Sequence, residues 1–478
     1  MERRAPASAQ IGDLLELEIE KLVFRGMGLA RWKGVTVFVP HSAEGDTLRA
    51  RVTQVKGHYL EAETEEILSP SPRRTPPFCR YFPTCGGCQW QHLSITAQRE
   101  CKTKILCEQL APLARWGRLP TWEILPVSSP EAYRTRAQIK VRRYGNQSRL
   151  GFFRPGSREL EEVDFCPLLH PDLQRIHCGL RDLRYPTLAQ LYPALKEVWV
   201  QRGSPRGEIL LALIAPFGER PALRLLYQRL KEVCPFLGGV TLVSRPEEGA
   251  FDQVGNPWVE MSLAGLKLKV GPTCFYQVGE EGAESIFRVI EAWAELGKSD
   301  RVLDLYCGVG AFSLLMGRRA GEVIGVEADP EAAILAKENA DRAGLSNVAI
   351  LRGMVEGVLF RELPANHFDL VILDPPRSGL SRRATEGLLR LAPPRMIYIS
   401  CDPSTLARDL SRLMERGYEC LRIQPLDLFP QTYHIETIVL LEARGKERSR
   451  GGSGFARKPL EKNVGEPKER EEEPARPN

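Results

Sequence analysis

Apolar and polar residues alternate in short runs over the first seventy positions of the chain. Over residues 15–22 nearly every second residue is apolar, as in a strand with one buried face. Further short apolar runs, separated by turns at 25–28 and 44–46, cover residues 29–32, 35–39, 47–55 and 59–67. Five strands of this length predict a small OB-like β-barrel at 13–67, a fold that often binds oligonucleotides. The alternative is a β module that serves only for packing.

The pattern changes from about residue 284, where short apolar runs alternate with helix-like stretches such as 330–343. Five of the runs have the length and composition of buried strands, at 301–305, 322–326, 348–352, 368–373 and 396–400. Repeated strand–helix units predict a parallel, doubly wound sheet of the Rossmann-like kind. The last two runs, 421–428 and 435–441, are joined by only a short loop, which predicts a closing antiparallel pair.

Between these two regions the chain mixes helix and strand patterns, after a proline-rich stretch at 69–77 that ends the barrel. Residues 91–115 are typical of a helix, and residues 133–143, 150–154, 240–244 and 263–270 of sheet. The fold prediction is therefore multidomain: the barrel at 13–67, a central α+β domain at 68–270 and an α/β domain at 271–442. We expect part of 90–125 to pack on the α/β domain, and the charged segment 443–478 to be a disordered tail.

The composition of the 478 residues narrows the class of protein. No apolar run approaches the roughly 18 residues of a membrane span, and the N-terminal residues lack the apolar centre of a signal peptide. We therefore expect a cytoplasmic protein whose 12 cysteines are metal ligands, catalytic or structural rather than disulfide-bonded. The net charge of +5 permits nucleic-acid binding without arguing for it. Nothing in the sequence implies an obligate protein partner.

Three cysteines stand close together after the proline-rich stretch, at Cys79, Cys85 and Cys88, with the spacing C-x5-C-x2-C. Two glycines between the last two would let the backbone wrap a ligand. A fourth ligand is missing locally, and Cys166 is the best candidate because a cysteine followed by proline recurs in cluster loops. The pattern predicts a zinc ion or an iron–sulfur cluster.

Residues 134–143 carry an unusual number of basic side chains flanked by aromatic ones. The basic residues are Arg134, Arg136, Lys140, Arg142 and Arg143. Such a ribbon can contact RNA phosphates while the aromatics stack on bases. A solvated strand face with no RNA contact is the alternative.

A glycine-containing turn follows the first strand of the α/β domain, with Asp304, Gly308 and Gly310 in the pattern D-x3-G-x-G. This is the place of a nucleotide-cofactor loop, and Glu327 at the end of the next strand would accept hydrogen bonds from ribose hydroxyls. The spacing is not that of a dehydrogenase, and no Lys–Ser/Thr pair of a P-loop follows. S-adenosylmethionine (AdoMet) is then the leading cofactor, and ordinary turn chemistry is the alternative.

Cys401 follows the strand at 396–400, and Pro403 suits the first turn of the helix after it. A thiolate at this edge of an α/β sheet would be a nucleophile, although a small buried residue that closes a strand is the simpler interpretation. The loop Asp374-Pro375-Pro376-Arg377 points to the kind of acceptor. Methylases of exocyclic amines often carry an aromatic residue where Arg377 stands, so a ring carbon is favoured.

Methylation of C5 of uracil would need both a nucleophile and a base. A thiolate that adds at C6 makes C5 nucleophilic, and a general base then removes the C5 proton so that the thiolate can leave. Cys401 fits the first role, and Glu436, at the start of the last strand, fits the second. A strand-edge carboxylate without a catalytic role is the alternative for Glu436, and His434 is the competing base.

Four segments together resemble the RNA uracil-5-methyltransferase family, in its 23S rRNA branch with a TRAM domain and an iron–sulfur cluster. They are SCDPSTLARDL (400–410), DPPRSGL (374–380), LDLYCGVGAFSL (303–314) and FPQTYHIETIVLLE (429–442). The resemblance extends over about residues 13–442. It implies Cys401 as the nucleophile, Glu436 as the base and a TRAM domain that binds RNA. It also implies cofactor contacts at Gln277, Tyr306, Glu327 and Asp374, and a [4Fe-4S] cluster on Cys79, Cys85, Cys88 and Cys166.

The chain departs from that family's pattern at two positions. Gly279 stands where members usually have Asn, and Met354 stands where an acidic or amide residue usually lies near the adenine, with Glu356 as a substitute. We expect changed cofactor affinity and an unchanged nucleophile and base.

The predicted activity is AdoMet-dependent methylation of a uridine in 23S rRNA. A transfer RNA substrate is the nearest alternative, and a noncatalytic RNA-binding protein is the alternative from another class. A cytosine-C5 enzyme would carry its cysteine in the fourth-strand loop, where this chain has Arg377 and Ser378.

Overall fold

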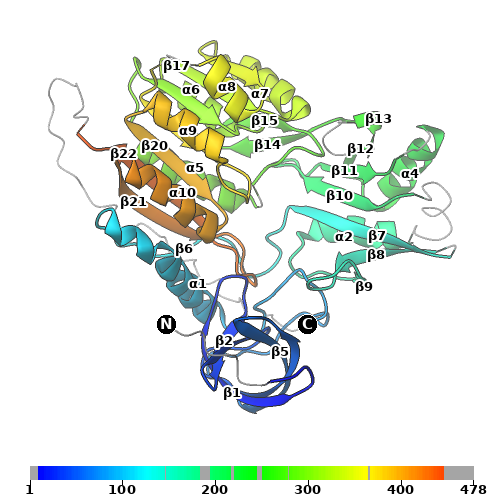
Figure 1. The fold of residues 1–478 in the computed structure, drawn as a ribbon. Coiled ribbons are helices and arrows are strands. Elements are labelled where there is room, and N and C mark those ends of the chain that lie inside the picture. The colour runs from blue at the N-terminus through cyan, green and yellow to red at the C-terminus, as the bar shows by residue number, and fades with distance from the viewer. Residues whose placement is uncertain are drawn as a thin grey trace, which may run out of the picture. The chain divides into compact units, whose positions relative to one another are not determined.

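The first five strands close into a barrel in the computed structural model, which describes residues 9–145, 147–182, 194–216, 220–244, 250–277, 279–363 and 367–445. The strands are β1 (Leu14–Leu22), β2 (Gly28–Trp32), β3 (Val35–Val39), β4 (Thr47–Val55) and β5 (Tyr59–Ser69), in the order β1-β2-β3-β5-β4. The alternating residues Leu15, Leu17 and Ile19 of β1 are buried inside it. The predicted barrel and its five strands are confirmed (Figure 1).

A seven-stranded sheet with two helices follows in the middle of the chain. Its order is β13-β12-β11-β10-β7-β8-β9. The elements are β7 (Arg136–Tyr144), β8 (Gln147–Phe153), β9 (Leu160–Glu162), α2 (Pro171–Asp182), β10 (Glu197–Arg202), β11 (Ile209–Ile214), α4 (Arg220–Val233), β12 (Leu237–Val243) and β13 (Ala250–Gly255).

The sheet predicted at residues 263–270 is a hairpin. Residues 263–270 do not form a single strand, because Ala264 and Gly265 both have positive φ and turn the chain back. The result is a separate hairpin of β14 (Val259–Leu263) and β15 (Leu266–Val270).

The C-terminal part is built on an eight-stranded sheet of order β18-β17-β16-β19-β20-β22-β21-β6. Its strands are β16 (Arg301–Leu305), β17 (Glu322–Glu327), β18 (Val348–Arg352), β19 (Leu370–Leu373), β20 (Arg395–Ser400), β21 (Tyr418–Asp427) and β22 (Glu436–Ala443). Its helices are α5 (Glu280–Ala294), α6 (Ala311–Gly317), α7 (Pro330–Arg342), α8 (Val355–Arg361), α9 (Arg382–Leu391) and α10 (Pro403–Glu415). Strands β16 to β20 are mutually parallel, and β22 pairs antiparallel with β20 and β21, as the sequence predicts.

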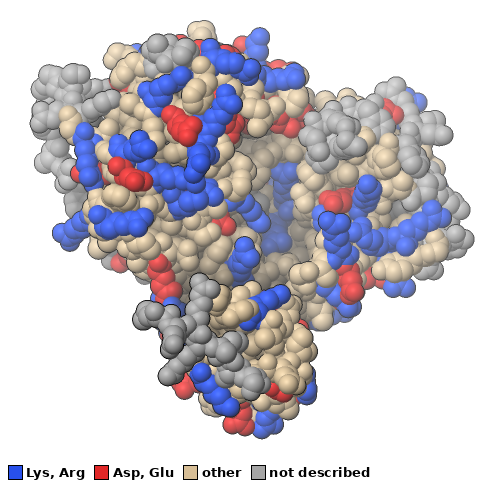
Figure 2. All heavy atoms as spheres, viewed as in Figure 1, with Lys and Arg blue, Asp and Glu red and all other residues tan. Residues whose placement is uncertain are grey.

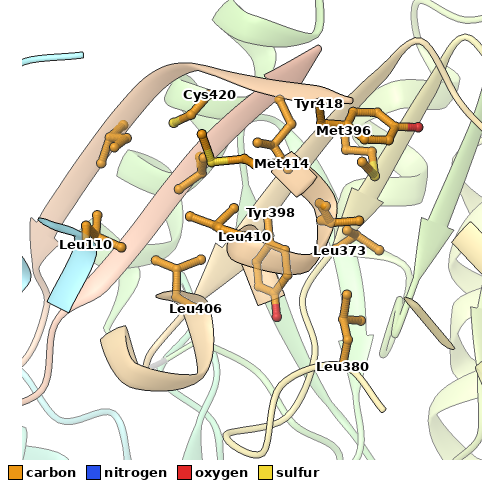
Figure 3. Packing of buried hydrophobic residues seen from close by; sticks show 14 of the residues in the cluster. Leu110, Leu373, Leu380, Met396, Tyr398, Leu406, Leu410, Met414, Tyr418 and Cys420 are labelled. Carbon is orange, nitrogen blue, oxygen red and sulfur yellow. The ribbon is translucent and has the colours of Figure 1, made fainter. Parts of the chain in front are cut away.

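The eighth strand and a covering helix come from far earlier in the chain. Strand β6 (Leu125–Pro126) pairs with Leu426 and Asp427 of β21. Helix α1 (Ile95–Leu110) and the short 3-10 helix η1 (Ala111–Arg115) share a core with α10 and the sheet. Figure 3 shows Leu406, Leu410 and Met414 of α10 between the sheet and Leu110 of α1.

The described residues up to Arg444 form one compact unit. The predicted disordered tail, apart from its first three residues, lies outside the described residues, and the predicted domain boundaries remain predictions. No helix in the described part of the chain has the length and apolar character that a membrane crossing requires.

Candidate active site

Cys401 lies where β20 ends and α10 begins. Asp402 caps the helix, because its carboxylate accepts hydrogen bonds from the backbone N–H groups of Ser404 (2.9 Å) and Thr405 (3.0 Å). Burial, followed by the charge of the neighbouring Glu436, raises the pKa of the Cys401 thiol to about 12. The thiol is therefore protonated at neutral pH unless a nearby positive charge or a base draws off its proton.

Glu436 lies beside that thiol on the neighbouring strand. Ser400 of β20 pairs with Thr437 of β22 in an antiparallel register, and the same register continued by one residue sets Cys401 opposite Glu436. Side chains of such opposing residues lie about 5 Å apart at Cβ. Burial and the carboxyl of Asp374 raise the pKa of Glu436 well above its ordinary value. The two groups that the sequence assigns to one reaction are thus brought together.

Arg377 is the cation of this site. The positive charge of its guanidinium opposes the rise in the pKa of the Cys401 thiol. The same guanidinium lies 3.5 Å from Nε2 of His434. Thr405 of α10 holds the backbone of Arg377 by donating from Oγ1 to its carbonyl (3.2 Å). Sequence reasoning used Arg377 only to exclude an amine acceptor and missed its contact with the thiol.

His434 is a weaker candidate base than Glu436. Burial, followed by the charge of Arg377, lowers the pKa of His434 to about 3. The imidazole is neutral at physiological pH, and its low basicity suits it poorly to proton abstraction. Its ring packs 4.4 Å from that of Tyr433, measured between ring centroids.

A pocket next to these groups collects most of the predicted cofactor residues. It is lined by Leu263, Phe275, Tyr276, Gln277, Ala283, Phe287, Tyr306, Cys307, Gly308, Val309, Ala311, Phe312 and Asp374. Gln277 donates from Nε2 to Oδ2 of Asp374 (3.4 Å). Tyr306 has φ of 64°, a strained backbone for a residue other than glycine and one that clusters at ligand sites. Three of the four predicted contacts, Gln277, Tyr306 and Asp374, therefore line one pocket.

Glu327, the fourth predicted contact, shapes the loop of this pocket. Its carboxylate accepts hydrogen bonds from the backbone N–H groups of Gly308 (2.8 Å) and Asp329 (2.7 Å). It stands at the end of β17, where the sequence places it.

Two buried carboxyls beneath the pocket have unusual acidity. Burial raises the pKa of Asp304 to about 7, although Ser313 donates a hydrogen bond to its Oδ2 (2.6 Å), and its other oxygen has no partner. Burial and the proximity of Asp304 likewise raise the pKa of Asp374 to about 7. Desolvated carboxyls of this kind cluster at functional sites. The sequence marked Asp304 only as the start of a loop pattern.

The two departures from the family's pattern differ in their surroundings. Gly279 begins α5 with φ of +84° and donates its N–H to Oγ1 of Thr135 (3.3 Å), so a glycine suits its backbone. Met354 is 64% exposed and begins α8. Glu356 accepts a hydrogen bond from the Ser381 hydroxyl (2.6 Å).

The four predicted ligand cysteines line a second pocket. Its walls are Cys79, Tyr81, Phe82, Cys85, Gly87, Cys88, Gln91, Arg134, Phe152, Val163, Cys166, Pro167 and Leu168. Burial raises the pKa of Cys85 to about 12 and that of Cys88 to about 11. Within the described residues, no three His, Cys, Asp or Glu side chains are grouped so that they would hold a single metal ion. The thiols surround a space instead of meeting at one point.

Hydrogen-bond donors and a cation surround these thiols. Gln91 donates from Nε2 to the Cys88 sulfur (3.3 Å), and the charge of Arg134 acts to lower the pKa of Cys88 against the effect of burial. Gly86 is confined, because a Cβ there would lie 2.7 Å from the carbonyl oxygen of Phe153.

The basic ribbon at 134–143 does not form one exposed face. Arg134 donates to the carbonyl of Gly87 (3.2 Å), and Arg136 donates to the carbonyl of Cys274 (2.8 Å), so both turn inward. Lys140 pairs with Glu197, while Arg143 is exposed. Figure 2 shows Lys and Arg side chains gathered over α9 and α10 and also over β7 and β8.

Comparisons with known proteins agree with this architecture. Residues 273–444 match the family model described as tRNA (Uracil-5-)-methyltransferase, and residues 8–64 match the TRAM domain. An uncharacterized RNA methyltransferase of Thermosynechococcus vestitus is 34% identical over 453 residues, covering 90% of this chain and 98% of its own. The 23S rRNA (uracil(1939)-C(5))-methyltransferase RlmD of Pectobacterium atrosepticum is 33% identical over 423 residues, covering 87% and 90%.

A solved structure shares the fold. It is the tRNA (uracil-54, C5)-methyltransferase of Pyrococcus abyssi in complex with S-adenosyl-L-homocysteine. The TM-score is 0.69 at 23% sequence identity, and the match covers 89% of this chain and 100% of that one.

Proposed function

The chain belongs to the RNA uracil-5-methyltransferase family, and from this premise we propose that it methylates C5 of a uridine in 23S rRNA with AdoMet as the methyl donor. The observation that carries the proposal is the juxtaposition of Cys401 and Glu436, across one strand pair, beside the pocket of Gln277, Tyr306 and Asp374. That arrangement supplies a nucleophile, a base and a place for the methyl donor within one site.

The first step is addition of the Cys401 sulfur to C6 of the uracil. The thiol gives up its proton to water, and the positive charge of Arg377 stabilises the thiolate that results. The new S–C6 bond pushes the electron pair of the C5–C6 double bond toward C5 and the O4 carbonyl, so that C5 becomes nucleophilic.

Gln277, Tyr306, Glu327 and Asp374 would hold AdoMet, which would supply the methyl group to C5 and leave as S-adenosylhomocysteine. Glu436 then acts as a carboxylate and removes the proton from C5. The electron pair of that C–H bond restores the C5–C6 double bond, and the sulfur of Cys401 leaves as a thiolate. The pKa of Glu436, raised by burial, suits a base that must take up a proton at neutral pH.

We further propose that Cys79, Cys85, Cys88 and Cys166 hold a [4Fe-4S] cluster. The pocket suits an anionic, thiolate-ligated group, because four thiols, the Gln91 amide and the Arg134 guanidinium all face it. Such a cluster would link the loop of Cys79, Cys85 and Cys88 to the segment of Cys166. In other proteins such clusters also transfer electrons. No step of the methylation requires it.

The substrate assignment to 23S rRNA rests on the relatives named for that activity, and transfer RNA is the second candidate because the family model and the solved structure carry tRNA names. The barrel and the cations over β7, β8, α9 and α10 provide the surface for RNA. The uridine must leave its stack to reach Cys401, which favours a loop in the RNA.

The test is methyl transfer from labelled AdoMet to ribosomal and transfer RNA that lack the modification, followed by digestion to nucleosides. We expect labelled 5-methyluridine in the large ribosomal RNA with the native enzyme, none with Cys401→Ala, and native activity with Cys107→Ala, which changes an exposed cysteine. Label in transfer RNA alone would move the substrate to the second candidate. No label in either RNA, with RNA affinity retained, would favour a noncatalytic binding protein.

A further inference from the structure

The segment from Asp427 to His434 leads directly into Glu436 and is held by a buried polar network that the reaction itself does not use. Its main partner is α1, which lies some three hundred residues earlier in the chain. The Lys102 ammonium donates to Oδ1 of Asp427 (2.6 Å) and to the carbonyl of Phe429 (3.0 Å). Lys102 is 0% exposed and Asp427 1% exposed, so this is a desolvated ion pair.

A second pair of contacts in the same network joins Gln98 of α1 to Gln431. Gln98 donates from Nε2 to Oε1 of Gln431 (2.9 Å) and accepts from the Gln431 backbone N–H at 2.8 Å. Gln98 is 0% exposed, and its Nε2 also lies 3.0 Å from the carbonyl oxygens of Trp90 and Leu93, so its two N–H groups are shared among three acceptors. All polar groups of its amide are therefore used, which leaves one position for the segment.

The other side of the segment is also tied down. The carbonyl of Gln431 accepts hydrogen bonds from the N–H groups of Gln89 and Trp90, both at 3.0 Å, and Tyr133 donates its hydroxyl to the carbonyl of Pro430 (3.1 Å). Gln431 itself has φ of 70°, a strained conformation that persists only because its surroundings impose it. A surface loop without function has no evident need of such anchoring.

We propose that Gln98 and Lys102 are positioning residues for Glu436: through the segment 427–434 they set the base against C5 of the uracil that Cys401 has attacked. The inference rests on the proposed function, because it presupposes the covalent step at Cys401. Addition at C6 depends on Cys401 and Arg377, which α10 and the loop after β19 hold. Proton removal depends on Glu436, and helix α1 holds the segment 427–434 that precedes this residue. Release of this network therefore impairs the second step more than the first.

The experiment measures the two steps separately on 23S rRNA transcribed in vitro, with full-length protein. Adduct formation is followed as denaturation-stable protein–RNA complex, and release as free RNA containing 5-methyluridine. Glu436→Gln, which keeps the shape and removes the base, sets the reference for a trapped adduct. The test variants are Lys102→Met, which leaves Asp427 paired with Arg99, and Gln431→Gly, which suits the positive φ and removes the side-chain contact. Lys104→Met is the matched control, since Lys104 lies on the same helix, is exposed and pairs with Glu44 of the barrel region.

We expect both test variants to slow release by about 10- to 100-fold, as small misplacement of a catalytic group does. The adduct should accumulate as it does in Glu436→Gln, while adduct formation, KM for RNA and binding of S-adenosylhomocysteine stay near native values. Lys104→Met should behave as the native enzyme. Native release rates in both variants, or an equal loss of adduct formation and release, would overturn the inference. If the native enzyme forms no methylated RNA, or Glu436→Gln traps no adduct, the proposed function fails instead.

Discussion

Arg377 determines how much of Cys401 is thiolate. Among the described residues of the site, its guanidinium is the group that lowers the pKa of this thiol, while burial, Glu436 and Asp374 all raise it. The surroundings of Cys401 therefore disfavour the thiolate, and Arg377, which does not line the cofactor pocket, is the side chain that favours it.

Replacing Arg377 by Met should slow methylation at pH 7 by about tenfold or more, because each unit of pKa is a tenfold change in thiolate at a pH well below the pKa. The loss should diminish as the pH rises. The measurement is the pH dependence of adduct formation, with Arg382→Met, an exposed arginine of α9, as control. An unchanged pH profile would show that Arg377 does not act on the thiol.

Ionisation of Glu436 should make activity rise and stability fall as the pH increases. Because burial raises its pKa in the folded state, the folded protein holds this proton more tightly than the unfolded chain does. Stability is thus greatest below the unfolded pKa of about 4.3 and falls as the pH rises through the raised value, while activity rises as the carboxylate forms.

Substitution of Glu436 by Gln should accordingly raise the melting temperature relative to the native protein at pH 8, with little difference near pH 4.5. Thermal unfolding at the two pH values measures this. Equal effects at both would mean that Glu436 ionises as readily in the folded protein as in the unfolded chain.

At the level of residues, motif and strand position were enough to select Cys401 and Glu436, because both stand at ends of predictable strands. The contacts of Arg377, Asp304, Gln98 and Lys102 could not be predicted from the sequence. Their importance comes from partners distant in the chain, such as Asp427 for Lys102, and no local pattern carries that information.

At the scale of elements, two adjacent glycines in the loop that carries Cys79, Cys85 and Cys88 allow a test of how closely this loop must pack to enclose the proposed cluster. A Cβ at Gly86 would lie 2.7 Å from the carbonyl oxygen of Phe153, whereas a Cβ at Gly87 would lie 3.5 Å from the nearest atom, the Cys85 sulfur, which is an ordinary contact. Of these two glycines, only Gly86 packs closely against the backbone of another segment.

We expect Gly86→Ala to lower the iron and sulfide content and the visible absorbance of protein purified without oxygen, because the cysteines can no longer enclose the cluster. Gly87→Ala should retain most of both. Full iron content in Gly86→Ala would show that the loop adjusts easily. Absence of iron from the native protein as well would remove the cluster from the proposal.

Strand and helix positions were predictable wherever a run was long or periodic, as in the barrel and in β16 to β20. The hairpin turn at Ala264–Gly265 was missed because apolar residues continue across it. Strand β6 was missed because two residues carry no periodicity, and its place in the sheet is decided by the partner strand β21.

For the whole molecule, the C-terminal sheet cannot be cut out at its family boundary. Helix α1 covers the face formed by Leu410 and Met414 of α10, and β6 covers the edge strand β21. A fragment of residues 271–444 would expose this apolar face and an unpaired strand edge.

Such a fragment should aggregate or unfold without a cooperative transition, while residues 68–444 should unfold cooperatively. Light scattering and thermal unfolding of the two fragments compare them. A cooperative transition of the shorter fragment at the melting temperature of the full chain would show that α1 and β6 contribute little to stability.

The ion pair between Lys102 and Asp427 also has a consequence in time. The two residues are 325 positions apart in the chain. At a synthesis rate of about 5 to 20 residues per second, Lys102 leaves the ribosome roughly 16 to 65 seconds before Asp427 has been made. During that interval Lys102 lacks Asp427, and the apolar face of α1 lacks helix α10. The nascent chain must keep this face from wrong associations over those seconds, and the active site can be completed only after Glu436 has been made.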